Sequence, residues 1–353
     1  METKTFNGAV LSKLGHPLNL EKSIKIPDPL EGQVLVKLFC SGVCHSQLME
    51  QKGHRGDDKF LPHLLGHEGS AVVISVGNGV TKVKPNDNVV LTWIVGDGLE
   101  GGPMKYESNS SLINAGSVTT FNEYAIVSEN RCVKIPNNFP KDIAALLGCA
   151  VMTGCGMVKN TLNPEEGKSI AIFGLGGIGL SALMLCYKYN FKQIFCIDIN
   201  QEKLLLAKKV NSNVKLINSK DTNCVHEIMS LTNGIGTDYA IDASGKASVT
   251  ETAFEIINKK TGHLVFASHP EKGSKISIDP HDLICGKKIT GSWGGESNPD
   301  KDVLFYCDLY LKGELKLDYL ISKKYSLSQV NDALNDLEYG RCLRPIINME
   351  HSK

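Results

Sequence analysis

Residues 169–183, SIAIFGLGGIGLSAL, join an apolar run typical of a strand to an apolar run typical of a helix through spaced glycines. Gly174, Gly176 and Gly179 have the spacing GxGxxG, and Gly177 opens the predicted helix. The first glycine permits a tight turn, the second lets N–H groups approach a phosphate, and the third lets the helix pack on the strand. The positive end of the helix dipole would face the same phosphates. We therefore predict a dinucleotide-binding unit, in preference to a glycine turn in a nucleotide-free domain.

An acidic residue ends the next predicted strand. QIFCID finishes at Asp198, nineteen residues after Gly179. A carboxylate at this place accepts hydrogen bonds from ribose hydroxyls and repels a 2′-phosphate, which favours NAD over NADP. Lys203, on the following helix, is predicted to lie beside the ribose. Strands and helices alternate from about residue 150 onward, which predicts a doubly wound parallel sheet in an α/β fold.

The N-terminal part of the chain has a different pattern of apolar and turn-forming residues. VLVKLF (34–39), SAVVISVG (70–77) and DNVVLTW (87–93) read as strands separated by Gly- and Pro-containing turns. This pattern predicts a mainly antiparallel, barrel-like domain. Residues 94–118 are rich in Gly and Ser and lack periodicity, so we expect a long loop there.

Composition excludes several classes of protein. A chain of 353 residues favours two domains, and its formal net charge of zero without a basic cluster favours neither nucleic acid nor membrane as partner. No apolar run has the length of a signal peptide or membrane span, so we predict a cytoplasmic protein. The eleven cysteines are scattered and odd in number, which argues against a secreted disulfide scaffold.

Three short motifs carry side chains that bind metals: SGVCHSQ (41–47), LLGHEGS (64–70) and LGCAVMTG (147–154). Taken singly, each cysteine could be a core residue and the histidine an ordinary loop residue. Together they offer two thiolates and one imidazole, a ligand set of catalytic zinc sites with one open position. The long separations between Cys44, His67 and Cys149 exclude a zinc finger and require the tertiary fold to assemble the site.

GVCHS, GHEG, GCAVMTG, GLGGIG and CIDIN occur in an order and separation that resemble the zinc-containing medium-chain alcohol dehydrogenases, over essentially the whole chain. The resemblance implies a Rossmann domain at residues 151–289, inserted in a GroES-like domain of residues 1–150 and 290–353. It also implies that Cys44, His67 and Cys149 bind the zinc ion.

The same resemblance implies further roles, residue by residue. Ser46 would receive the substrate's proton, His45 would contact the coenzyme pyrophosphate, and Glu68 would be a carboxylate able to approach the metal. Thr153 would lie near the nicotinamide, Arg344 would contact phosphate, and Trp93 would form part of the wall of the substrate pocket. For Trp93, simple burial in the core is an equal alternative.

The sequence departs from the family pattern in two places. Because no cysteine lies between Cys44 and Cys132, we expect one catalytic zinc ion and no structural zinc. Gln47 and Met49 stand where the family often has an acid and a histidine. We expect the Gln47 carbonyl to accept the hydrogen bond of the zinc-bound histidine, and His45 or water to end the proton relay.

The resemblance therefore implies reversible oxidation of an alcohol to an aldehyde or ketone, with hydride passing to NAD and zinc as Lewis acid. Two alternatives stay open: a zinc-free quinone or enone reductase on the same fold, and a non-catalytic NAD-binding redox sensor. We expect a small, neutral or aromatic alcohol as substrate. The family further implies a homodimer or homotetramer.

Overall fold

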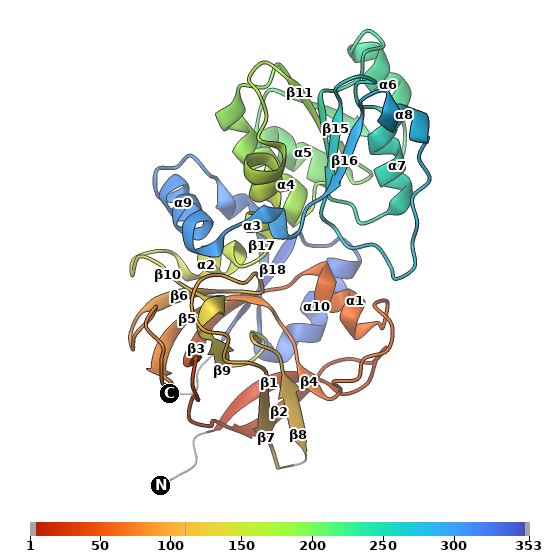
Figure 1. The fold of residues 1–353 in the computed structure, drawn as a ribbon. Helices are drawn as coiled ribbons and strands as arrows, with labels where there is room; N and C mark the ends of the chain where they lie inside the picture. Colours follow the sequence, from red (N-terminus) through yellow and green to blue (C-terminus); the bar gives the residue numbers. More distant parts are fainter. Residues whose placement is uncertain (1–4, 110, 350–353) are drawn as a thin grey trace. The chain divides into compact units, whose positions relative to one another are not determined.

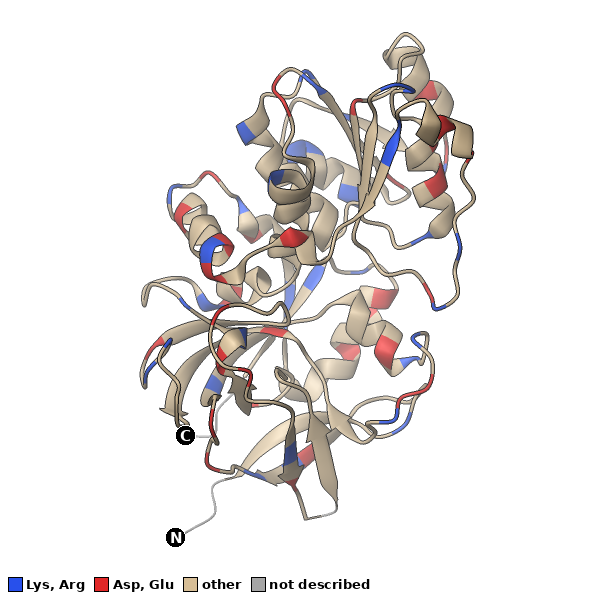
Figure 2. Ribbon diagram, viewed as in Figure 1, with Lys and Arg blue, Asp and Glu red and all other residues tan. Residues whose placement is uncertain are grey.

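The computed structural model describes residues 5–109 and 111–349 (Figure 1). Contacts within the chain divide it into two compact units. The first comprises Met1–Cys149, Asn298–Glu314 and Ile321–Lys353, and the second comprises Ala150–Ser297 and Leu315–Leu320. Figure 2 shows that Lys and Arg positions alternate with Asp and Glu positions along the ribbon of both units.

The second unit is built on a six-stranded sheet in which every neighbouring pair is parallel. Its strands, in spatial order, are β13 (Val214–Asn218), β12 (Gln193–Asp198), β11 (Ser169–Phe173), β14 (Tyr239–Asp242), β15 (His263–Phe266) and β16 (Lys288–Gly291). Its helices are α3 (Ala150–Gly156), α4 (Gly177–Leu185), α5 (Gln201–Val210), α6 (Cys224–Leu231), α7 (Ala247–Glu255) and α8 (Pro280–Ile284). Shorter helical segments are η2 (Met157–Leu162), η3 (Cys186–Tyr189), η4 (Gly294–Glu296) and η5 (Leu317–Leu320). The predicted doubly wound α/β sheet is confirmed.

The strand order of this sheet reverses at β11. All five residues of β11 are buried, and the strand pairs with β12 on one side and β14 on the other. The chain winds outward in both directions from this pair, so the carboxyl ends of β11 and β14 flank the crevice where nucleotides bind in such sheets. Phe173, Phe195 and Leu264 belong to one apolar cluster that packs this sheet.

The second unit extends further than the sequence predicts. β16 pairs in parallel with β15 from Lys288 to Gly291, so the sheet continues past residue 289. The main segment of the unit ends at Ser297, two residues before the start of α9 (Pro299–Leu311), which belongs to the first unit. The sixth strand of the sheet is the physical reason for the later boundary.

The first unit contains two sheets in which most neighbouring strands are antiparallel. One has five strands in the order β2 (Asn19–Lys25), β1 (Thr5–Leu11), β4 (His63–Leu64), β8 (Leu112–Ala115) and β7 (Met104–Glu107). The other runs β10 (Cys132–Lys134), β6 (Asn88–Thr92), β5 (Glu68–Val76), β3 (Gln33–Gly42), β18 (Arg344–Asn348) and β17 (Ile321–Ser326), with β9 (Tyr124–Ser128) also paired to β3. Helices α1 (His45–Gln51), α2 (Lys141–Leu147), α9 and α10 (Val330–Glu338), with η1 (Glu129–Arg131) and η6 (Leu327–Gln329), complete the unit.

The prediction of a loop over residues 94–118 is wrong for part of that segment. β7 and β8 form an antiparallel hairpin, which joins the five-stranded sheet through β4. Tyr106 is buried, and its ring packs edge-on against Phe6 with 5.4 Å between the ring centroids. Its hydroxyl accepts a hydrogen bond from the Ile126 N–H at 2.7 Å. The strands are too short, four residues each, for their alternation to be recognised within a Gly- and Ser-rich segment.

The rest of this segment is held by carboxylates. Glu129 accepts hydrogen bonds from the backbone N–H groups of Thr81, Lys82 and Leu99 at 2.6–2.7 Å. Glu100 accepts one from the Ser128 hydroxyl at 2.6 Å. These contacts tie the loop before β7 to the strand β9 and its continuation.

Among residues 5–109 and 111–349, no single helix is long and apolar enough to cross a membrane. α2 together with α3 and η2 reaches that length and hydropathy only as a bent pair.

Candidate active site

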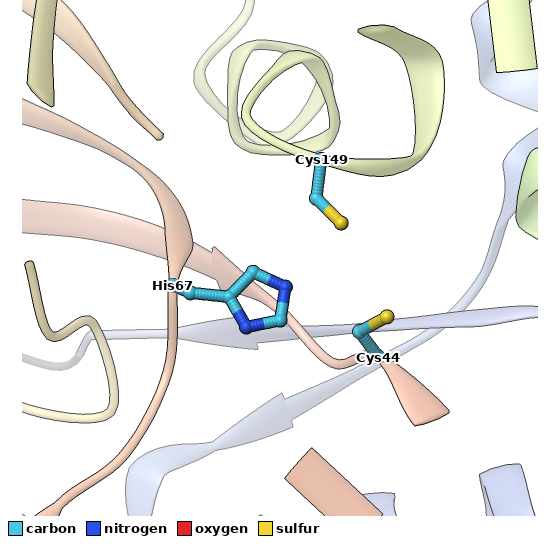
Figure 3. Close-up of side chains that lie close together, drawn as sticks. All are labelled: Cys44, His67 and Cys149. Atoms are coloured by element: carbon cyan, nitrogen blue, oxygen red, sulfur yellow. The ribbon is translucent and has the colours of Figure 1, made fainter. Parts of the chain in front are cut away.

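The first unit brings the three predicted metal ligands together. Cys44 precedes α1, His67 lies between β4 and β5, and Cys149 lies just after α2. Their ligand atoms all lie within 4.8 Å of one another, and Figure 3 shows the side chains pointing toward a common point. Residues separated by more than a hundred positions in the sequence thus form one cluster, as the motifs predict.

Two glycines allow the backbone to approach closely beside these ligands. Gly66 has a φ of +90°, and a Cβ atom there would lie 2.3 Å from the hydroxyl of Thr120. A Cβ atom at Gly148 would lie 2.2 Å from the carbonyl oxygen of Leu91. Both distances are far too short for a Cβ atom, so only glycine fits at these two positions. The backbone can therefore bring His67 and Cys149 to the cluster because glycine precedes each of them.

The donor chemistry of the cluster fits a zinc ion. A hydrogen bond from the Cys149 thiol holds the pKa of Cys44 well below its usual range, against the effect of burial and with help from Arg344. The same contact and burial raise the pKa of Cys149, while the nearby Trp93 side chain acts in the opposite direction. His67 Nε2 is buried and has no hydrogen-bond partner among the described residues. The two cysteine side chains and an unpartnered imidazole nitrogen form a Cys₂His set, one of the ligand sets of catalytic zinc sites.

Two oxygen atoms on residues near the ligands in sequence, Ser46 Oγ and Glu68 Oε2, are also buried and have no hydrogen-bond partner within the described part of the chain. The other carboxylate oxygen of Glu68 accepts a hydrogen bond from Arg344 Nη2, and both side chains are buried. Gly42 makes room for this carboxylate, since a Cβ atom there would lie 2.6 Å from Glu68 Cδ. The sequence assigned Arg344 to a phosphate. The structure places its guanidinium on Glu68, so the phosphate contact stays a prediction.

Gln47 is bonded differently from the prediction. Its Oε1 accepts a hydrogen bond from the Cys44 backbone N–H at 2.6 Å, and its Nε2 lies 2.8 Å from His67 Nδ1. The prediction that the Gln47 carbonyl would accept from His67 is therefore wrong. The reason is helix capping: Gln47 is the third residue of α1, from where its side chain reaches back to the orphan N–H at the helix start.

Trp93, His45 and Met49 lie in the same unit. Trp93 follows β6 directly and is partly buried, and its side chain lies close enough to Cys149 to lower the pKa of that thiol. His45 is exposed and Met49 is half-buried, both on α1. The contacts of Trp93 with Cys149 and of Arg344 with Glu68 were not predicted from the sequence, because they join residues with no local pattern in common.

The second unit carries the glycine motif in the predicted context. Gly174 has a φ of +83°, and a Cβ atom at Gly179 would lie 1.9 Å from the Gly174 carbonyl oxygen. At Gly176, the residue before α4, a Cβ atom would meet nothing within 4 Å. The turn therefore requires glycine at its first and third positions, while the second faces open space at a helix N-terminus, a cradle suited to a pyrophosphate.

Asp198 ends β12 with both carboxylate oxygens fixed by the backbone. Oδ2 accepts from the Leu175 N–H at 2.7 Å and Oδ1 accepts from the Asn200 N–H at 2.8 Å. Ile199, next in sequence, is 61% exposed. No sequence motif marks Ile199, although an exposed apolar residue at this strand end is suited to stacking on a base. Lys203 lies in the first turn of α5, which Asn200 caps.

Thr153, the remaining predicted residue of the second unit, lies in α3 and is 4% exposed. Its backbone carbonyl approaches Gly295, which has a φ of +73°. The structure thus describes all the predicted site residues, and it brings together those of the metal cluster and, separately, those of the glycine motif.

Comparison with known proteins gives two family matches. Residues 30–137 match the alcohol dehydrogenase GroES-like domain, and residues 177–304 match the zinc-binding dehydrogenase family. The S-(hydroxymethyl)glutathione dehydrogenase of Komagataella pastoris is 31% identical over 97% of each chain. The class-3 alcohol dehydrogenase of Drosophila melanogaster is also 31% identical over 97% of each chain.

A solved structure is similar over the same extent. The benzyl alcohol dehydrogenase from Acinetobacter calcoaceticus has 29% identity and a TM-score of 0.88, and the match covers 98% of this chain and 100% of that one. The GroES-like and Rossmann parts of the predicted fold are thereby confirmed.

Proposed function

Because the chain belongs to the zinc-type medium-chain alcohol dehydrogenases, we propose that it oxidises a small alcohol to an aldehyde or ketone, reversibly, with one zinc ion and NAD⁺. The observation that carries the proposal is the convergence of Cys44, His67 and Cys149 within 4.8 Å, with His67 Nε2 buried and unpartnered. A buried polar atom without a partner is costly, and a bound cation removes that cost.

Cys44, His67 and Cys149 would hold the ion. Bound there, zinc supplies Lewis acidity toward an alcohol oxygen. Arg344 holds Glu68 through one carboxylate oxygen and leaves the other unpartnered beside the cluster. The pairing compensates the buried negative charge of Glu68, which keeps the carboxylate in place between the two thiol-bearing segments.

Ser46 is the residue placed to move the substrate's proton. It lies in the first turn of α1, two residues after a ligand, and its hydroxyl is buried without a partner. A hydroxyl can accept the proton of an alcohol on its oxygen while donating its own. Met49 offers no such group, so we assign the outer end of the relay to water or to the exposed His45.

The glycine turn of the second unit would bind the coenzyme. The open space at Gly176 and the N-terminus of α4 would receive the pyrophosphate, and Asp198 would accept hydrogen bonds from the adenosine ribose. A carboxylate at this place favours NAD over NADP, and NAD⁺ supplies the hydride acceptor of the reaction.

Two finer assignments complete the proposal. We assign a single zinc ion to each chain, because residues 94–118 contain no cysteine and are held instead by Glu129 and by the hairpin that carries Tyr106. We assign a neutral or aromatic alcohol as substrate, since benzyl alcohol is named for a relative of very similar fold and the chain has no basic cluster.

The test combines metal analysis with turnover. Protein loaded with zinc is incubated with NAD⁺ and a panel of primary, secondary, aromatic and sugar alcohols, and NADH formation is followed by absorbance. We expect one zinc per chain, turnover of at least one alcohol, and loss of turnover on treatment with a chelator. Metal-independent reduction of quinones or enones would instead indicate a zinc-free reductase, and NADH binding without turnover would indicate a sensor.

A further inference from the structure

A second group of metal-binding side chains lies in the first unit, and it shares no residue with the cysteine cluster. Glu50 lies in the last turn of α1, Asp58 lies in the loop that follows, and His63 begins β4. One ligand atom from each residue lies within 4.8 Å of the other two. His63 Nε2 lies 2.8 Å from Asp58 Oδ2 and 4.0 Å from Glu50 Oε1. Two carboxylates and one imidazole therefore meet where the loop after α1 reaches β4.

The ring of His63 has the orientation that metal-binding histidines adopt. Its side chain is 9% exposed, and Nδ1 lies 2.9 Å from the backbone carbonyl oxygen of Leu64. A carbonyl oxygen can only accept a hydrogen bond, so Nδ1 donates to it. Such a bond fixes the ring of a metal-binding histidine and directs its other nitrogen toward the ion. Here the other nitrogen is Nε2, which faces both carboxylates.

The carboxylate of Asp58 is also fixed from behind. Oδ1 accepts a hydrogen bond from the Phe60 N–H at 2.8 Å, which leaves Oδ2 directed at His63. Carboxylates that bind metals are commonly held by such hydrogen bonds. An ion bound at about 2.1 Å holds neighbouring ligands about 3–3.5 Å apart. The observed separations of 2.8 Å and 4.0 Å lie on either side of this range, and the Glu50 side chain, 32% exposed, is free to rotate into it.

The charges of this group suit a divalent cation. Two ionised carboxylates carry two negative charges, and a proton on the imidazole would neutralise only one of them. Two lysines of the same loop are engaged elsewhere, since Lys52 Nζ binds the Glu338 carboxylate and Lys59 Nζ lies over the Phe60 ring at 5.2 Å. Imidazole nitrogen and carboxylate oxygen without sulfur are donors for the first-row ions from Mn²⁺ to Zn²⁺.

We propose that Glu50, Asp58 and His63 form a second metal site, which takes a divalent first-row cation such as Mn²⁺ and ties the loop after α1 to β4. The site has no thiolate and one partly exposed ligand, so it binds its ion more weakly than the cysteine cluster and loses it on dialysis. The zinc ion of the proposed function is then the one that each chain retains. The inference does not depend on that function, because it uses no residue of the cysteine cluster or the glycine motif.

The experiment titrates Mn²⁺ into dialysed protein that retains zinc at the cysteine cluster. Free Mn²⁺ is measured by its electron paramagnetic resonance signal in the wild type, Glu50→Gln, Asp58→Asn and Asp57→Asn. Asp57 is the exposed neighbour of Asp58, so its variant removes the same charge from the loop but no proposed ligand. We expect one Mn²⁺ per wild-type chain, at least about tenfold weaker binding in Glu50→Gln and Asp58→Asn, and less than about threefold change in Asp57→Asn.

Two further measurements locate the ion, with thermal unfolding to show that each variant is folded. Electron spin echo envelope modulation detects the nitrogen of an imidazole bound directly to Mn²⁺, and we expect this signal in the wild type and its loss in His63→Gln. Hydrogen–deuterium exchange of residues 52–62 should slow when Mn²⁺ is added to the wild type and stay unchanged in Asp58→Asn.

Three results would overturn the inference. If the wild type binds no Mn²⁺ at millimolar concentration, His63 and Asp58 form an ion pair only. Wild-type affinity in folded Glu50→Gln and Asp58→Asn would place the ion elsewhere, and equal losses in Asp57→Asn would show that loop charge alone attracts it. Mn²⁺ binding with the expected variant pattern, but without oxidation of any alcohol, would leave this site standing and refute the proposed function instead.

Discussion

Replacing Glu129 by alanine should loosen the segment of residues 94–107, without unfolding the protein. Glu129 is 1% exposed, and its carboxylate accepts from the backbone N–H groups of Thr81, Lys82 and Leu99 at 2.6–2.7 Å. Burial alone would raise the pKa of Glu129, but these three N–H groups outweigh it and lower the pKa below the usual carboxyl value. The carboxylate thus ties the backbone at Thr81 and Lys82 to the backbone at Leu99.

The size of the effect follows from the donors. A buried donor left unsatisfied costs about 1–3 kcal/mol. All three hydrogen bonds are only partly buried, so water can replace part of what the carboxylate supplies. We therefore expect Glu129→Ala to destabilise the segment by about 2 kcal/mol, which corresponds to roughly 30-fold more frequent local opening.

The assay is hydrogen–deuterium exchange of peptides covering residues 94–107, with peptides of the second unit as internal reference. Glu129→Gln is the matched control, because it keeps one oxygen acceptor and should show a smaller increase. Since the folded pKa of Glu129 is lowered, its contribution is present above the usual carboxyl pKa and is lost as the pH falls through the folded value. Protection of the segment in Glu129→Gln should therefore vary less with acid than in the wild type.

Two results would refute this reasoning. One is unchanged exchange of residues 94–107 in Glu129→Ala, since the carboxylate would then hold nothing. The other is a second tightly bound zinc ion per chain whose removal by chelator opens the same segment. Loss of protection across both units would show instead that the substitution acts on global stability, and the local estimate would be wrong.

Four further predictions concern the site. Cys44→Ala should abolish turnover while NADH binding, read by fluorescence, persists; loss of both would point to misfolding. Ser46→Ala should retain its zinc, by metal analysis, but lower kcat by about a hundredfold or more, and an unchanged kcat would remove Ser46 from the relay. Asp198→Ala should narrow the preference for NAD over NADP in steady-state kinetics, where an unaltered ratio would count against its role. Gly179→Ala should disrupt the second unit, because its Cβ would lie 1.9 Å from a carbonyl oxygen, whereas Gly176→Ala should keep its thermal stability and weaken only coenzyme binding.

Local patterns sufficed for much of the fold. The alternation of strands and helices, with glycines at fixed spacing after an apolar strand, predicts the parallel sheet and its turn because both depend on short-range geometry. Gly174 needs a positive φ, and Gly179 needs room beside a carbonyl; both requirements are visible as glycines in the sequence. The β7–β8 hairpin was not predicted, because each of its strands has only four residues and this is too short to show a clear alternation of apolar and polar residues.

The sequence also predicts the metal ligands, since two cysteines and a histidine in characteristic motifs indicate zinc before any fold is known. By itself, then, the sequence determined which atoms are available, through residue type and motif, and which local turns are possible. Only the tertiary structure decided which way Gln47 points and what Arg344 and Glu129 hold. The reason is that hydrogen bonds depend on the direction of donors and acceptors supplied by distant backbone, such as Leu99 for Glu129, and residue types alone do not specify those directions.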